Sequence, residues 1–229
     1  MLDTDVLVIW LDLVDHADLD ALLATLSGDE RARVARLAST ELRRRAVVRL
    51  ARRREVLGEL LEVSPSAVEL ATDASGRLAV QGSHGRHAVS SSSSGDVGLL
   101  VVAAGREIGV DVESVSEVVD SPRFMARVAT SREAAALAEL DDAARPGALA
   151  RLWTRKEAYL KATGEGIGNG VVHVEVPLEE GLWAAPWEPV RDGTTWLLYD
   201  LVCPTPDLAA ALVVVPDGTH LLELVIERR

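Results

Sequence analysis

Two acidic residues, Asp111 and Glu113, lie in the segment Ile-Gly-Val-Asp-Val-Glu at 108–113, which alternates apolar and polar residues as a β-strand does. Side chains two residues apart on a strand share a face, so these carboxylates would be about 7 Å apart. Facing solvent, they would form an ordinary polar sheet surface. Facing a cleft, they would repel each other unless a cation lay between them, and Mg²⁺ binds one or two carboxylates together with phosphate oxygens and water.

A second group of reactive side chains lies on the helix expected at about 146–163. Trp153, Glu157 and Lys161 are four residues apart and share one helical face, and Lys156 lies beside that row. Glu157 and Lys161 could form no more than a surface ion pair. The tryptophan on the same face indicates partial burial, however, and a buried acid with two lysines needs partners, which an anionic ligand and its metal would supply.

Arginines are concentrated on the helix expected at about 40–61. These are Arg43, Arg44, Arg45, Arg49, Arg52, Arg53 and Arg54. Each could be an ordinary solvated residue on the polar face of the helix. Their clustering also fits a local anion-binding site within an acidic protein.

The composition excludes several classes of protein. The chain has 229 residues, 48% hydrophobic and 26% charged, and its net charge of −12 with 3% aromatic residues disfavours a nucleic-acid-binding surface. One cysteine, Cys203, cannot form an internal disulfide. The apolar stretches are shorter than the roughly 18 residues of a membrane span, and the N-terminus has no basic region typical of a secretory signal. We expect a soluble, cytoplasmic protein that binds neither nucleic acid nor membrane.

The order of the expected elements predicts an α+β fold of two similar halves, at 1–115 and 116–229. Segments 96–104 and 107–113 flank Gly105-Arg106 as a predicted hairpin, and 207–226 repeats that layout. Only the first copy carries the two carboxylates. Because the halves would cover each other, we expect a monomer. Low complexity would make the five serines at 90–94 a flexible linker, but the apolar strands that follow disfavour this.

Three segments, in order, resemble motifs of the Sfp-type 4′-phosphopantetheinyl transferases. Residues 153–167 (WTRKEAYLKATGEGI) match the signature of a tryptophan, Lys-Glu-Ala, a further lysine and a glycine turn. Residues 109–113 resemble the family's Gly-Val/Ile-Asp-Val/Ile-Glu motif. Residues 129–133 are similar to its Phe-Ser-x-x-Glu element, with alanine and threonine at the first two positions. The resemblance covers about 49–167 and implies the family's architecture of two α/β halves related by a pseudo-two-fold axis.

The resemblance implies transfer of the 4′-phosphopantetheine arm of coenzyme A to a serine of an apo acyl or peptidyl carrier protein, with Mg²⁺ as cofactor. Asp111, Glu113 and Glu157 would then hold Mg²⁺ against the diphosphate of coenzyme A. Glu157 would also be the general base for the carrier serine. Lys156 and Lys161 would contact phosphate oxygens, and Lys161 would stabilise charge developing on the diphosphate.

The same resemblance implies that further basic residues contact coenzyme A. Arg49 and Arg53 match the family's paired basic residues and would bind the 3′-phosphate, and Arg77 resembles the family's Gly-Lys-Pro element without its proline. Ser93 stands where the family has a phosphate-binding histidine, and a serine cannot carry that charge. A relative that binds coenzyme A or a carrier without catalysis is therefore an alternative, and a hydrolase of another pyrophosphate is a third.

The resemblance also implies a surface for the carrier protein. Carrier proteins dock through acidic helices, so a chain of net charge −12 must present a local apolar or basic patch to them. The candidate patch consists of Val118, Val119, Phe124 and Met125. The alternative is that these four residues belong to the ordinary core.

Overall fold

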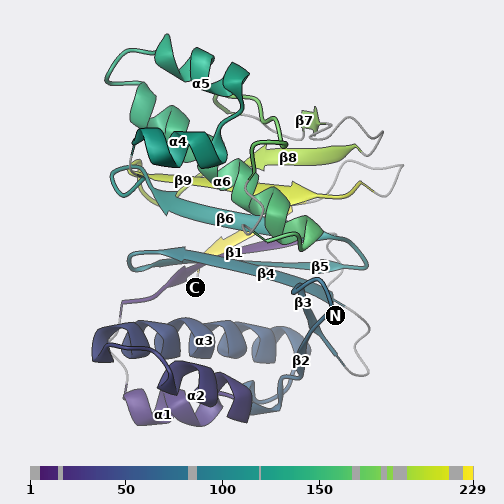
Figure 1. Ribbon diagram of the computed structural model, residues 1–229. Coiled ribbons are helices and arrows are strands. Elements are labelled where there is room, and N and C mark those ends of the chain that lie inside the picture. The colour runs from purple at the N-terminus through teal and green to yellow at the C-terminus, as the bar shows by residue number, and fades with distance from the viewer. Residues whose placement is uncertain are drawn as a thin grey trace.

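The computed structural model describes residues 6–14, 18–81, 87–118, 120–166, 171–181, 185–187, 195–216 and 224–228 (Figure 1). The strands are β1 (Val6–Asp12), β2 (Leu70–Thr72), β3 (Leu78–Val80), β4 (His87–Ser94), β5 (Val97–Ala104), β6 (Ile108–Ser114), β7 (Ala185–Trp187), β8 (Trp196–Asp200), β9 (Leu208–Val214) and β10 (Leu224–Arg228). The α-helices are α1 (Leu19–Thr25), α2 (Gly28–Ala35), α3 (Thr40–Leu61), α4 (Pro122–Val128), α5 (Ser131–Ala138) and α6 (Arg145–Thr163), and a 3₁₀ turn covers Pro65–Ala67. The predicted α+β class is confirmed.

The strands form two sheets that pack face to face. The first has the order β10-β1-β5-β4-β3-β2 and the second the order β6-β9-β8-β7. All pairs are antiparallel except β1 with β10. Apolar side chains fill the space between the sheets, between the first sheet and α3, and between the second sheet and α6. The layers are therefore α3, first sheet, second sheet and α6, with α1 and α2 beside α3 and with α4 and α5 beyond the second sheet (Figure 1).

The predicted hairpin of 96–113 is wrong, although both of its strands exist. β5 pairs with β1 and β4, whereas β6 pairs with β9 in the other sheet. Gly105, with a φ of +63°, lies in the turn that carries the chain from one sheet to the other. A left-handed conformation is cheap only for glycine, so the turn itself is readable from the sequence, but the pairing partners are not.

The second predicted hairpin, at 207–226, separates in the same way. β9 lies in the second sheet, and β10 returns to the first sheet beside β1. The sequence places the turn of this copy at Pro216-Asp217-Gly218, and its last two residues lie outside the described part of the chain. Each sheet therefore contains strands from both predicted halves.

The five serines form the end of β4 and are not a linker. Ser94 pairs with Val97 across a two-residue turn in which Gly95 has a φ of +54°. The hydroxyl oxygen of Ser90 accepts a hydrogen bond from the Val110 N–H at 3.0 Å, and that of Ser94 accepts one from the Ser114 N–H at 2.9 Å. Because β6 is an edge strand, these two hydroxyls satisfy backbone donors that have no strand partner on that side.

The close packing of β6 on α6 depends on a glycine. A Cβ atom at Gly109 would overlap the Ala158 carbonyl oxygen and the Ala162 nitrogen, both of which belong to the helix backbone. A helix backbone cannot yield as a flexible side chain would. Glycine at this position therefore brings the strand that bears Asp111 against the helix that bears Glu157.

We expect Gly109→Ala to lower the free energy of unfolding by about 3 kcal/mol or more, because the added methyl group must push a strand away from a helix. Thermal unfolding followed by circular dichroism measures the effect. Gly28→Ala is the matched control, since no atom lies within 4 Å of a Cβ at that helical position. Equal melting temperatures for the two variants would contradict the close approach of β6 and α6.

None of the described helices is both long enough and apolar enough to cross a membrane.

Candidate active site

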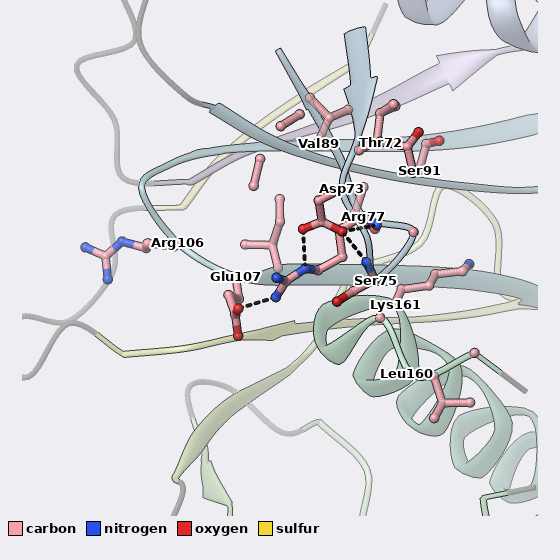
Figure 2. Close-up of a pocket in the computed structure, with 18 of the residues that line it drawn as sticks. Thr72, Asp73, Ser75, Arg77, Val89, Ser91, Arg106, Glu107, Leu160 and Lys161 are labelled. Atoms are coloured by element: carbon pink, nitrogen blue, oxygen red, sulfur yellow. Dashed lines mark hydrogen bonds and ion pairs between the residues drawn. The ribbon is translucent and has the colours of Figure 1, made fainter. Parts of the chain in front are cut away.

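A large cavity lies where the end of α6 meets the first sheet. Its volume is about 680 Å³, and its walls come from the β2–β3 turn, β4, the β5–β6 turn and α6. Lys161 and Leu160 line it from the helix, and Asp73, Ser75 and Arg77 line it from the β2–β3 turn (Figure 2). Glu157 also lines this cavity. Volumes of this size are typical of small-molecule and cofactor sites.

Asp111, Glu157 and Lys161 form the polar centre beside the cavity. The Lys161 ammonium donates to Asp111 Oδ1 at 2.6 Å and to the Val110 carbonyl oxygen at 3.1 Å. Asp111 is 2% exposed and Glu157 is 7% exposed, whereas Lys161 is half-buried. The structure therefore brings together three of the side chains that the sequence places in the site.

Burial makes both carboxyl groups harder to ionise. Burial, followed by the negative charge of Asp111, raises the pKa of Glu157 to about 7, although the nearby Lys161 lowers it. Burial also raises the pKa of Asp111, against the ion pair with Lys161 and the hydrogen bond from Ser92. A carboxyl group with a pKa near neutral can accept and release a proton at physiological pH.

Two buried carboxylate oxygens fit a cation. Asp111 Oδ2 and Glu157 Oε1 have no hydrogen-bond partner among the described residues. Buried acceptors without partners are costly, and hard oxygen ligands of this kind are those that Mg²⁺ prefers. Two carboxylates are enough for Mg²⁺ when phosphate oxygens and water complete its six ligands.

The predicted convergence of three carboxylates needs correction. Within the described parts of the chain, no group of three acidic, histidine or cysteine side chains is arranged to hold a metal ion. Glu113 instead accepts a hydrogen bond from the Trp153 indole at 3.3 Å. It remains close enough to Glu157 to raise the pKa of that residue by repulsion. The pair that fits a metal is Asp111 with Glu157.

The predicted contact of Lys156 with phosphate is also wrong. Lys156 is 0% exposed, and its ammonium donates to Glu133 Oε2 and to the Val128 carbonyl oxygen, each at 2.6 Å, and to the Val171 carbonyl oxygen at 3.3 Å. All three of its donors are therefore in use. One helical position separates Lys156 from Glu157, and that is sufficient to turn its side chain into the core.

Glu133 is the residue that sequence reasoning missed as the partner of Lys156. Its carboxylate also accepts the backbone N–H groups of Thr130 at 2.7 Å and Val176 at 2.8 Å. The Thr130 hydroxyl accepts the Glu133 N–H at 3.1 Å and completes a capping box at the start of α5. The sequence signal was available, since Thr-x-x-Glu before an apolar run is typical of this cap.

The two arginines assigned to the 3′-phosphate have different surroundings. Arg53 lines the cavity and pairs with Glu30 Oε1 at 2.8 Å. Arg49 is not among the lining residues, and its guanidinium donates to the hydroxyl of Ser93 at 3.4 Å. The structure thus joins Arg49 to the serine that stands at the histidine position of the resembled family. Burial lowers the pKa of both arginines.

Arg77 lines the cavity but is held by two acidic residues. Its guanidinium pairs with Asp73 at 3.0 Å and also with Glu107, which lies in the β5–β6 turn (Figure 2). The two carboxylates were not recognised in the sequence because they lie in turns on either side of the cavity. Arg77 therefore bridges two walls of the cavity in this arrangement.

The predicted carrier-docking patch is half-buried. Val118, Phe124 and Met125 pack against the core beneath α6, and Val119 lies outside the described residues. Phe124 and Trp153 form an edge-to-face pair with ring centroids 5.3 Å apart. These two rings, with the exposed arginines Arg123 and Arg127, line a second, smaller cavity of about 310 Å³.

The chain is similar to several known proteins. A model of the 4′-phosphopantetheinyl transferase superfamily matches residues 107–186. The 4′-phosphopantetheinyl transferase HetI of Nostoc sp. is 33% identical over 221 residues, covering 94% of this chain and 90% of the relative. The putative 4′-phosphopantetheinyl transferase slr0495 of Synechocystis sp. is 28% identical, covering 72% and 68%. The crystal structure of the Thermotoga maritima holo-[acyl-carrier-protein] synthase is 22% identical with a TM-score of 0.33, covering 48% and 62%.

Proposed function

Because the chain belongs to the 4′-phosphopantetheinyl transferase superfamily, we propose that it transfers the 4′-phosphopantetheine arm of coenzyme A to a serine of an apo acyl or peptidyl carrier protein, with Mg²⁺ as cofactor. The observation that carries the proposal is the group of Asp111, Glu157 and Lys161 beside the 680 Å³ cavity. Two carboxylates with free oxygens and one ammonium suit a diphosphate and its metal.

In this reaction the carrier serine oxygen forms a bond to the phosphorus that bears the pantetheine arm. The bond from that phosphorus to the bridging oxygen breaks, and adenosine 3′,5′-bisphosphate leaves. The Glu157 carboxylate accepts the serine proton, and burial, which raises its pKa to about 7 before a metal binds, makes it a stronger base. The half-buried Lys161 ammonium stabilises charge on the diphosphate oxygens. Bound Mg²⁺, held by Asp111 and Glu157, would supply further charge neutralisation.

The remaining phosphate contacts come from arginines of α3 and of the β2–β3 turn. Arg53 lies on the cavity wall, and Arg49, joined to Ser93, supplies a positive charge next to the position where the family's histidine would lie. Arg77 lines the cavity while it is paired with Asp73 and Glu107, whose charges offset its own. We assign the 3′-phosphate to Arg49, Ser93 and Arg53 on this basis.

Incubating the protein with coenzyme A, Mg²⁺ and an apo carrier protein tests the proposal. Mass spectrometry is expected to show a carrier that is heavier by one phosphopantetheine group. Binding of coenzyme A without this mass gain would favour the non-catalytic alternative. Release of nucleotide in the absence of a carrier would favour hydrolysis of a pyrophosphate.

We further propose that the carrier docks over α4. The exposed side chains of Arg123 and Arg127 flank the small cavity formed by Phe124 and Trp153, and Trp153 in turn contacts Glu113 near the active site. A basic rim around an apolar centre is complementary to an acidic helix that carries an apolar residue.

Arg127→Glu is expected to raise the KM for the carrier about tenfold, because the new glutamate would repel the acidic helix of the carrier. The KM for coenzyme A should stay unchanged, since Arg127 does not line the larger cavity. Steady-state kinetics with each substrate varied in turn measures both values. Arg36→Glu, an equal change of charge at the exposed residue that follows α2, is the control, and an equal effect of both variants would show only a response to net charge.

A further inference from the structure

The serines of β4 contact β6 at alternate positions, and the central contact differs from the outer two. Ser90 and Ser94 each accept a backbone N–H of β6, from Val110 and Ser114 respectively. Ser92 lies between them on the same face of β4. Its hydroxyl bonds not to the backbone of β6 but to the side chain of Asp111, at 2.6 Å.

The two side chains that hydrogen-bond to Asp111 both donate to the same oxygen. Ser92 donates to Oδ1, and the Lys161 ammonium donates to the same Oδ1 at 2.6 Å. Lys161 also donates to the Ser92 hydroxyl oxygen at 3.1 Å, so the hydroxyl proton is directed toward the carboxylate. Oδ2 of Asp111 is buried and has no hydrogen-bond partner among the described residues. The two oxygens of this carboxylate are therefore not equivalent.

The two donors to Oδ1 differ in how firmly they are held. Lys161 has a long flexible side chain, is half-buried and divides its ammonium among three acceptors. Ser92 has a single side-chain torsion and sits on a strand that is paired with β5. When the ammonium of Lys161 turns toward a phosphate oxygen, Ser92 can keep its bond to Oδ1 and preserve the orientation of the carboxylate.

We infer that Ser92 is a positioning residue that fixes Asp111 with Oδ2 as its metal-binding oxygen and so leaves Lys161 available for the substrate. This inference rests on the proposed function. Ser92 acts through Asp111 and touches neither the metal nor the carrier. Removing a hydrogen bond that orients a metal-binding side chain commonly lowers the affinity for the metal by about ten- to a hundredfold.

Titration calorimetry with Mg²⁺ on the protein saturated with coenzyme A tests the inference, after correction for Mg²⁺ bound by free coenzyme A. Ser92→Ala is expected to weaken Mg²⁺ binding by about ten- to a hundredfold. Ser92→Thr, which keeps the hydroxyl, is expected to bind Mg²⁺ within a few-fold of the wild type. This second variant also separates loss of the hydroxyl from a general disturbance of the strand.

Ser94→Ala is the matched control, because it removes a hydroxyl from the same face of the same strand without touching Asp111. It is expected to lower the melting temperature while leaving the affinity for Mg²⁺ unchanged. Wild-type affinity in Ser92→Ala, or equal weakening in Ser94→Ala, would overturn the inference alone. A wild-type protein that binds no Mg²⁺ in the presence of coenzyme A would overturn the proposed function, and the inference with it.

Discussion

Replacing Glu157 by glutamine is expected to reduce the rate of phosphopantetheine transfer at least about a hundredfold, because the amide can neither accept the serine proton nor supply a charged metal ligand. The shape of the side chain is kept. Transfer followed by mass spectrometry of the carrier measures the effect. The fold should survive, since Glu157 makes no hydrogen bond through its buried Oε1.

We also expect a change in the stability of the Glu157→Gln protein, which can be measured independently of its activity. The pKa of Glu157 is raised to about 7 from 4.5, so ionisation of this group disfavours the folded state once the pH exceeds the unfolded value. Glutamine removes that unfavourable contribution, and the melting temperature at pH 8 should equal or exceed that of the wild type. Glu139→Gln, an exposed change at the end of α5, should alter neither rate nor stability. A Glu157→Gln enzyme with wild-type turnover would remove Glu157 from both the base and the metal roles.

Loss of the buried ammonium of Lys156 is expected to produce the largest fall in stability. Lys156→Met leaves the Glu133 carboxylate buried at 3% exposure without its charged partner. Breaking a buried pair from one side costs about 3–5 kcal/mol. For a chain of this length that corresponds to a fall in melting temperature of about 6–20 °C. Thermal unfolding by calorimetry or circular dichroism measures it.

The matched control for this prediction is Arg45→Met, which breaks an exposed pair with Glu41 and should cost less than about 1 kcal/mol. Below its melting temperature the Lys156→Met protein should bind coenzyme A as the wild type does, because the ammonium faces the core. A stable variant that had lost affinity for coenzyme A would instead restore the phosphate-binding role predicted from the sequence.

Local patterns predicted which residues share a face, but not what that face meets. Alternation at 108–113 placed Asp111 on a strand, and helical spacing placed Glu157 in line with Lys161. Both follow from the periodicity of a single element. The sheet to which β6 belongs depends on contacts with β9, about a hundred residues later in the chain, and no local pattern encodes that choice.

The errors at Lys156 and Glu113 have the same origin. Spacing along α6 places Lys156 beside the row that contains Glu157 and Lys161. The helix is covered on nearly all sides, however, so the Lys156 side chain meets Glu133 rather than solvent. Glu113 shares a strand face with Asp111, yet one of its carboxylate oxygens accepts a hydrogen bond from the Trp153 indole. The partner of Lys156 comes from α5 and the partner of Glu113 comes from α6, and neither contact is set by the spacing within a single element.

The crossing of β6 into the second sheet makes the site depend on contact between the two sheets. Asp111 on β6 and Glu157 on α6 lie on one side of that contact, whereas Ser92 comes from the first sheet and Arg53 from α3. The Ser92 hydroxyl bonds to Asp111 across the contact at 2.6 Å. Any widening between the sheets would therefore break that bond and alter the geometry of the acids that the proposed reaction uses.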